Sequence, residues 1–169
     1  MILGPVQINH LIEYHGLVTP YENDPVRRDS VDLRIARILR HKGGAHLSNE
    51  KRAVSIGNFE EVKPIHGIWA LDPQNHYVLE SIEEINLPVH VAAIQIPRST
   101  LMRAGIQADS GYIDPGYSGK IFMMVETPGP GKTEISFGFS AMQLVLLPAE
   151  PVPPYDGSYQ GGSLMPNVA

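Results

Sequence analysis

Residues 111–126 read GYIDPGYSGKIFMMVE, and this stretch places a carboxylate, Asp114, between an isoleucine and a Pro-Gly turn. The second half, KIFMMVE, is typical of a buried strand. Two interpretations of Asp114 are open at this point. Aspartate is common beside Pro-Gly because its short side chain bonds to the nearby backbone of a turn. Alternatively, the turn holds the carboxylate at the edge of the core, where it contacts a substrate.

Short strand-like segments recur along the rest of the chain. Val31, Leu33 and Ile35 alternate with Asp32, Arg34 and Ala36, which is the period-two pattern of a strand. Similar runs, separated by turn residues, occupy residues 76–81, 89–96, 120–126, 133–138 and 140–147. Before them, helical spacing of apolar residues predicts one short helix over residues 5–15. The whole pattern predicts a mainly β protein of the barrel, sandwich or jelly-roll type.

Composition and charge narrow the class of protein. The 169 residues, 43% hydrophobic and 18% charged, suit one globular domain, and 16 glycines with 15 prolines indicate many turns. A formal charge of -5 disfavours nucleic-acid binding, and the absence of cysteine excludes thiolate catalysis. No apolar run approaches the roughly 18 residues that span a membrane, and the N-terminus does not resemble a signal peptide. We therefore expect a soluble, cytoplasmic protein.

The last residues differ from the rest of the chain. Residues 148–169, PAEPVPPYDGSYQGGSLMPNVA, are rich in proline and glycine and have almost no apolar periodicity. This composition predicts a flexible C-terminal arm beyond a β domain of residues 1–147. The arm nevertheless carries Tyr155, Tyr159 and Gln160, which a purely disordered tail would not need.

Two apparent motifs do not meet their requirements. The segment PGPGKT at residues 128–133 lacks the first glycine of a phosphate-binding P-loop, because that position is Glu126. None of the seven histidines has His-Glu-x-x-His spacing or an accompanying carboxylate cluster, so we predict no histidine metal site.

Residues 96–105, IPRSTLMRAG, form a better candidate site. Ser99 suits the N-cap of a one-turn helix that Gly105 ends, and Ser99 and Arg103 then share one face. Free N–H groups, a hydroxyl and the guanidinium groups of Arg98 and Arg103 together suit phosphate oxygens. The alternative is a capped turn with two solvated arginines. If the segment binds phosphate, it and Asp114 are expected to converge on one pocket.

Taken together, several segments resemble the dUTPase and dCTP deaminase superfamily, and within it the archaeal-type branch. The segments are DSVDLRI at 29–35, LPVHVAAIQIPRSTLMRAGI at 87–106, GYIDPGYSGKI at 111–121, MQLVLLP at 142–148 and YDGSYQGG at 155–162. Their order and spacing are more specific than any one motif. The resemblance implies a distorted β-barrel or jelly roll and a homotrimer with active sites at subunit contacts.

The resemblance also implies roles for individual residues. Arg98, Ser99 and Arg103 match an Arg-Ser-x-Leu-x-Arg segment that binds the triphosphate. Asp114 matches an aspartate that contacts the deoxyribose 3′-hydroxyl and, in dUTPases, positions the attacking water. Tyr117 matches an aromatic residue that lies near the sugar and helps to exclude a 2′-hydroxyl.

Further matches concern the phosphates and the C-terminal arm. Asp32 matches an aspartate near the phosphates and magnesium, and Gln143 matches a glutamine that reaches the phosphate chain. Tyr155, Tyr159 and Gln160 match a C-terminal segment that closes over the nucleotide. The resemblance therefore implies a Mg²⁺-dependent enzyme that acts on a pyrimidine deoxyribonucleotide.

The reaction depends on one position. Deamination needs a proton shuttle, which in the deaminases is a glutamate five residues after the closing glycine of the turn. That position is Met124 here, and Glu126 would lie roughly 6–7 Å further along a strand. Hydrolysis at the α-phosphate needs no such glutamate, so the sequence favours a dUTP diphosphatase. The alternatives are a dCTP deaminase, with one or two activities and with Glu126 or an unrecognised group as its shuttle, and a non-catalytic nucleotide-binding regulator.

Overall fold

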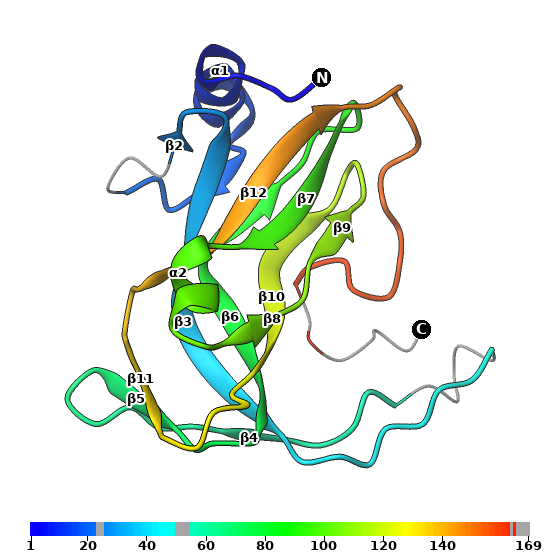
Figure 1. The fold of residues 1–169 in the computed structure, drawn as a ribbon. Helices are drawn as coiled ribbons and strands as arrows, with labels where there is room; N and C mark the ends of the chain where they lie inside the picture. Colours follow the sequence, from blue (N-terminus) through cyan, green and yellow to red (C-terminus); the bar gives the residue numbers. More distant parts are fainter. Residues whose placement is uncertain (23–25, 50–54, 163, 165–169) are drawn as a thin grey trace.

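The computed structural model of the chain describes residues 1–22, 26–49, 55–162 and 164. The described residues form two helices and twelve strands (Figure 1). The helices are α1 (Pro5–His15) and α2 (Ser99–Arg103). The strands are β1 (Val18–Thr19), β2 (Val26–Arg27), β3 (Ser30–His41), β4 (Phe59–Glu61), β5 (Ile68–Leu71), β6 (His76–Asn86), β7 (Val91–Pro97), β8 (Gln107–Ala108), β9 (Gly111–Ile113), β10 (Ser118–Glu126), β11 (Thr133–Ser136) and β12 (Ser140–Pro148).

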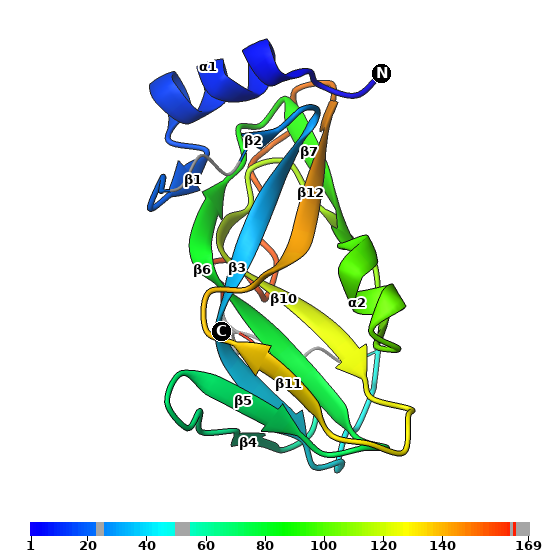
Figure 2. The same ribbon diagram turned by 60° about the vertical axis from the view of Figure 1, so that its left-hand side comes forward.

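Ten of these strands form one antiparallel sheet. Its order is β8-β10-β6-β3-β12-β7-β9, with β1 beside β6 and with β2 and β4 beside β3. The sheet curls around its buried face, with α1 at one end and a separate sheet of β5 and β11 at the other (Figures 1 and 2). This arrangement confirms the predicted mainly β fold of the distorted-barrel type.

Alternation along the central strands divides the side chains between two faces. Val31 and Leu33 of β3 and Leu144 of β12 are buried in the core. Cross-strand neighbours point to the same face, and Leu144 pairs with both Val31 and Gln95 of β7. The intervening residues, among them Asp32 and Gln143, therefore belong to the opposite face of the sheet.

The first helix agrees with its prediction in both position and ends. Pro5 occupies the first turn, where its missing N–H costs nothing, and Gly16 ends the helix in the left-handed conformation with φ 61°. Ile8 and Leu11 are buried against the end of the sheet. No helix in the described part of the chain is long and apolar enough to cross a membrane.

The second helix differs from its prediction by one residue. It begins at Ser99, so the N-cap position falls on Arg98 and not on Ser99. Arg98 makes no side-chain capping bond, because a guanidinium group has no acceptor for the free N–H groups, and it pairs with Asp32. The helix is one turn long, as the sequence predicts, and its Leu101 is buried.

Candidate active site

The Pro-Gly turn closes a hairpin that is open along its middle. At one end of the hairpin, Ala108 of β8 pairs with Val125 of β10. At the other end, the Tyr117 N–H donates a 3.2 Å hydrogen bond to the Asp114 carbonyl. Between these points β9 pairs with β7, and the described residues show no pairing of β9 with β10. A cavity of about 360 Å³, a size typical of small-ligand sites, is lined by both strands.

The turn supports both interpretations of Asp114. Pro115 and Gly116 occupy its two central positions, and Gly116 has a φ of 78°, which only glycine adopts readily. Asp114 is exposed at the rim of the cavity and is one of its lining residues. The carboxylate thus belongs to a turn and also faces a space that a small molecule can fill.

Tyr117 forms part of the cavity wall. It is only 9% exposed, and its hydroxyl donates a hydrogen bond to the Lys120 carbonyl. Burial, with smaller contributions from Tyr155 and Glu84, raises the pKa of Tyr117 to about 12. The phenol therefore stays neutral at physiological pH and offers a ring face, not a charge.

The described part of the C-terminal arm lies against this hairpin. The Tyr155 N–H donates to the Pro115 carbonyl at 3.1 Å, and Tyr155 and Tyr159 line the cavity. Gln160 binds the turn backbone on both sides: it donates to the Gly116 carbonyl at 3.0 Å and accepts from the Ser118 N–H at 2.9 Å. Residues 163 and 165–169 of the predicted arm lie outside the described residues.

A second group of the predicted residues surrounds Arg98. Its guanidinium group donates to Asp32, which is 4% exposed, across 2.7 Å. Gln143 pairs with Asp32 across β3 and β12, and its side-chain amide donates to the Ser30 hydroxyl at 2.7 Å. Asp32 thus holds Arg98 at the start of α2.

Ser99 and Arg103 extend this group along α2. Both side chains are exposed, and neither lines the cavity beside Asp114. A cation and a hydroxyl on one short helix remain suitable for phosphate oxygens. We refer to Asp32, Arg98, Ser99, Arg103 and Gln143 below as the arginine group.

The structure does not bring the arginine group and Asp114 into one pocket of a single chain. Gln143 pairs with Ile96, so these side chains and Arg98, two residues further on, belong to the outer face of the sheet. Gln95, which lines the Asp114 cavity, belongs to the inner face. The expected convergence on one pocket is therefore not met within one chain.

Neither of the two positions considered for a deaminase shuttle, Met124 and Glu126, lines the cavity. The β10 residues that line the cavity are Lys120, Ile121 and Phe122. Glu126 lies four residues beyond Phe122, or about 13 Å along a strand. Its carboxylate is 3.1 Å from His76 Nδ1, and the two residues face each other across β10 and β6. Glu126 is thus paired with His76 at the end of β10 that lies away from the cavity.

Gln95 is a polar residue of the cavity that sequence reasoning missed. This side chain is 5% exposed, and its amide nitrogen has no hydrogen-bond partner among the described residues. A signal was present in the sequence, because Gln95 follows Val91 and Ala93 at alternate positions of a strand, where an apolar residue is expected.

The described residues contain no group of three or more His, Cys, Asp or Glu side chains that could hold a metal ion. Asp32, the predicted magnesium contact, accepts a hydrogen bond from Arg98. Mg²⁺ in nucleotide enzymes is commonly bound through one or two carboxylates together with substrate phosphates and water. A metal contact at Asp32 therefore stays a prediction.

Comparison with known proteins gives the family context. Residues 2–148 match the family described as dCTP deaminase-like. A probable deoxyuridine 5′-triphosphate nucleotidohydrolase from Methanopyrus kandleri is 32% identical, over 94% of this chain and 99% of that protein. A dCTP deaminase from Aeropyrum pernix is 33% identical, over 95% of this chain and 92% of that protein.

One solved structure supports the fold. The crystal structure of 2′-deoxycytidine 5′-triphosphate deaminase from Agrobacterium tumefaciens superposes with a TM-score of 0.67 over 86% of this chain, at 16% identity. This chain spans 47% of that protein, about half its length. Similarity at this level of identity concerns the fold alone.

Proposed function

Because the chain belongs to the dCTP deaminase-like family, whose relatives are named both dUTP nucleotidohydrolase and dCTP deaminase, we propose that it is a dUTP diphosphatase. The proposed reaction converts dUTP and water to dUMP and pyrophosphate with Mg²⁺. One observation carries the choice: Met124 stands where the resemblance puts the deaminase glutamate, and the nearest carboxylate along the strand, Glu126, is paired with His76.

Asp114 is the proposed catalytic residue. It lines the mouth of the cavity with an exposed carboxylate, which suits a group that contacts both a sugar hydroxyl and a water molecule. The carboxylate orients the water and accepts its proton while the water oxygen attacks the α-phosphorus. The bond from the α-phosphorus to the bridging oxygen breaks, and pyrophosphate leaves.

The arginine group is the proposed triphosphate site. Arg98 and Arg103 each offer a planar fork of donors that matches phosphate oxygens, and Ser99 and Gln143 add neutral donors. Asp32 fixes the orientation of Arg98 through their 2.7 Å hydrogen bond. Mg²⁺ bound to the phosphates would neutralise the charge that develops on the departing pyrophosphate.

We propose that the two halves of this site come from different copies of the chain. Arg98 belongs to the outer face of the sheet and does not line the cavity beside Asp114. A homotrimer, the assembly that the family resemblance implies, would bring the arginine group of one subunit to the cavity of another. The mostly apolar cavity would then hold the sugar and base, with Tyr117, Tyr155 and Tyr159 around them.

The first test is to follow two products from two substrates. The purified protein is incubated with Mg²⁺ and either dUTP or dCTP, and pyrophosphate and ammonia are measured together. We expect pyrophosphate from dUTP and neither product from dCTP. Ammonia from dCTP would contradict the proposal and favour a deaminase, and the Glu126→Gln variant would then show whether that residue is its shuttle. Binding of dUTP without either product would favour a regulator.

A second test concerns the shared site. Asp114→Asn and Arg98→Ala chains are each expected to be inactive, because each removes one half of the site. When the two chains are co-expressed with different tags and purified through both, mixed trimers pair an intact cavity with an intact arginine group. Pyrophosphate release should return in part. Its complete absence from mixed trimers would overturn the shared-site arrangement but would leave the choice of reaction untouched.

A further inference from the structure

Gln95 occupies an inner position of β7, where its neighbours at alternate positions are small and apolar. Val91 and Ala93 are buried, and Gln95 itself is 5% exposed. Across β7 and β9 it pairs with Gly111, at the start of the segment that leads to Asp114. A Cβ at position 111 would lie 3.5 Å from the Gln95 Oε1 atom, so the amide packs against Gly111, and both residues line the cavity.

The amide of Gln95 differs from two other polar groups in the cavity wall. Lys120 donates its ammonium group to the Ile82 carbonyl, and the Tyr117 hydroxyl donates to the Lys120 carbonyl. The Gln95 amide nitrogen is buried and has no partner among the described residues. A buried donor without a partner lowers stability, and a ligand that enters the cavity beside Gln95 would satisfy it.

The position of Gln95 indicates which part of a ligand it would meet. Asp114 lies exposed at the rim, whereas Gln95 lies in the buried wall beside Ile113 and Ile121. A ligand with its sugar hydroxyl at Asp114 would direct its most deeply inserted part toward Gln95. Apolar walls with one polar amide suit a flat ring that has a hydrogen-bonding edge, and they do not suit a phosphate.

We propose that Gln95 is a base-recognition residue, and that its side-chain amide hydrogen-bonds the polar edge of the pyrimidine ring. This inference rests on the proposed function for the identity of the ligand. A uracil ring presents carbonyl acceptors next to an N–H donor, and a glutamine amide offers the complementary donor and acceptor. Rotation about the last side-chain torsion, which is broad and roughly two-fold, lets the amide align with that edge.

The test replaces Gln95 by methionine, which is similar in length and flexible but cannot make the hydrogen bond. Binding of dUMP to the full-length protein is measured by calorimetry, and unfolding is followed without ligand. We expect dUMP affinity to fall about three- to tenfold. The melting temperature without ligand should rise by roughly 2–6 °C, because the substitution removes a buried polar group that has no partner. Gln95→Leu should behave in the same way.

Two controls separate base recognition from other effects. Deoxyribose 5-phosphate, which lacks the base, should bind wild type and Gln95→Met equally. Gln74→Met, at an exposed position in the loop between β5 and β6, should change neither dUMP affinity nor melting temperature.

The outcomes distinguish this inference from the proposed function. Unchanged dUMP affinity in Gln95→Met, equal weakening of the base-free probe, or a lower melting temperature would each overturn it, as would a wild-type protein that binds no dUMP. A wild-type protein that binds dUMP but releases no pyrophosphate from dUTP would contradict the proposed reaction. The Gln95→Met titration would still decide the role of this residue.

Discussion

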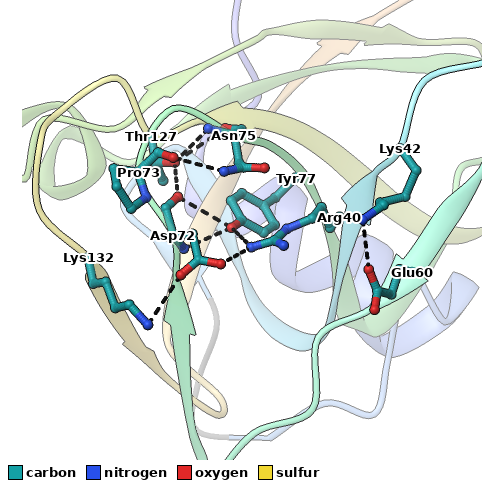
Figure 3. Close-up of polar contacts among 9 residues, drawn as sticks. All are labelled: Arg40, Lys42, Glu60, Asp72, Pro73, Asn75, Tyr77, Thr127 and Lys132. Atoms are coloured by element: carbon teal, nitrogen blue, oxygen red, sulfur yellow. Dashed lines mark hydrogen bonds and ion pairs between the residues drawn. The ribbon is translucent and has the colours of Figure 1, made fainter.

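The carboxylates at the two ends of β10 lie in different surroundings. At the first end of β10 lies the open cavity, whose lining residues include Gln95, Asp114 and Tyr117. Beyond its other end lies a closed cluster, in which the polar groups bind one another (Figure 3). This cluster consists of Arg40, Asp72, Tyr77, Thr127 and Lys132.

In the closed cluster, contacts between protein groups use most of the donors and acceptors. Arg40 donates to the Asp72 carboxylate and, at 2.9 Å, to the Tyr77 hydroxyl. The same hydroxyl accepts from the Asp72 N–H at 2.9 Å, and Lys132 Nζ lies 3.2 Å from the Asp72 carboxylate. Thr127, 2% exposed, donates its hydroxyl to the Asp72 carbonyl at 2.7 Å. These contacts tie β3 to the loops that follow β5 and β10.

This difference indicates which of the two regions we expect to be functional. Both regions contain a carboxylate beside aromatic and cationic residues, so residue types alone do not separate them. Asp72 is bound by two cations, whereas Asp114 is exposed at a cavity. We therefore expect substitutions at the cavity to change activity, and substitutions in the closed cluster to change stability.

The largest expected effect is that of Asp114→Asn. Turnover of dUTP should fall by about 10²–10⁴ if the carboxylate accepts the proton of the attacking water. Because Asp114 is exposed, the denaturation midpoint should stay close to that of wild type. Steady-state pyrophosphate release and urea unfolding measure the two properties. Asp109→Asn, an exposed carboxylate of the same hairpin that does not line the cavity, is the matched control. Wild-type turnover in Asp114→Asn would remove this residue from the mechanism.

Arg98→Ala should affect both properties, because Arg98 is proposed to bind phosphate and also pairs with buried Asp32. Loss of the partner of a carboxylate that is 4% exposed should cost about 1–3 kcal/mol, less than for a fully buried pair because Arg98 is 37% exposed. Urea unfolding of Arg98→Ala, Asp32→Asn and the double variant gives the coupling energy. The double variant should be about as stable as Arg98→Ala. Strictly additive losses would show that the pair contributes nothing to stability.

The fold could be predicted in advance because its signals are local. Period-two alternation predicted the central strands, and the helical spacing of apolar residues predicted α1. The short strands β8 and β9 were not predicted, since strands of two or three residues carry no periodicity. Their pairing nevertheless creates the open hairpin.

The resemblance predicted individual residues of the site, but it did not predict how they are arranged in space. Register places Gln143 and Gln95 on opposite faces of the sheet, and register depends on partners distant in the sequence. Gly119 is a second residue whose role depends on a partner distant in the sequence. A Cβ there would lie 2.2 Å from the Gly162 nitrogen, so the approach of the arm explains this glycine, and the sequence shows the residue without its reason.

Thr127→Val tests the closed cluster directly. The substitution keeps the shape of the side chain but removes the hydroxyl that binds the Asp72 carbonyl, so unfolding should become easier by about 1–2 kcal/mol. Turnover of dUTP should not change. Thr133→Val, at a half-buried position of β11, is the matched control and should leave the urea midpoint nearly unchanged. A fall in turnover without a fall in stability would show that the closed cluster is not purely structural.

The smallest expected effect is a pH-dependent one at Asp72. Hydrogen bonds from Arg40 and then Lys132 lower the pKa of the Asp72 carboxyl below its ordinary value of 3.8. A carboxyl whose pKa is lower in the folded state stabilises the protein above the unfolded pKa, near 3.9, and this contribution is lost as pH falls through the folded value. Asp72→Asn should therefore have a lower urea midpoint than wild type at pH 7, and this difference in midpoint should disappear at acid pH.

Because these side chains are partly exposed, 1 M NaCl should narrow the gap between the two midpoints at pH 7. A gap that is equal at pH 7 and pH 2.5 would mean that the charge of Asp72 does not stabilise the closed cluster.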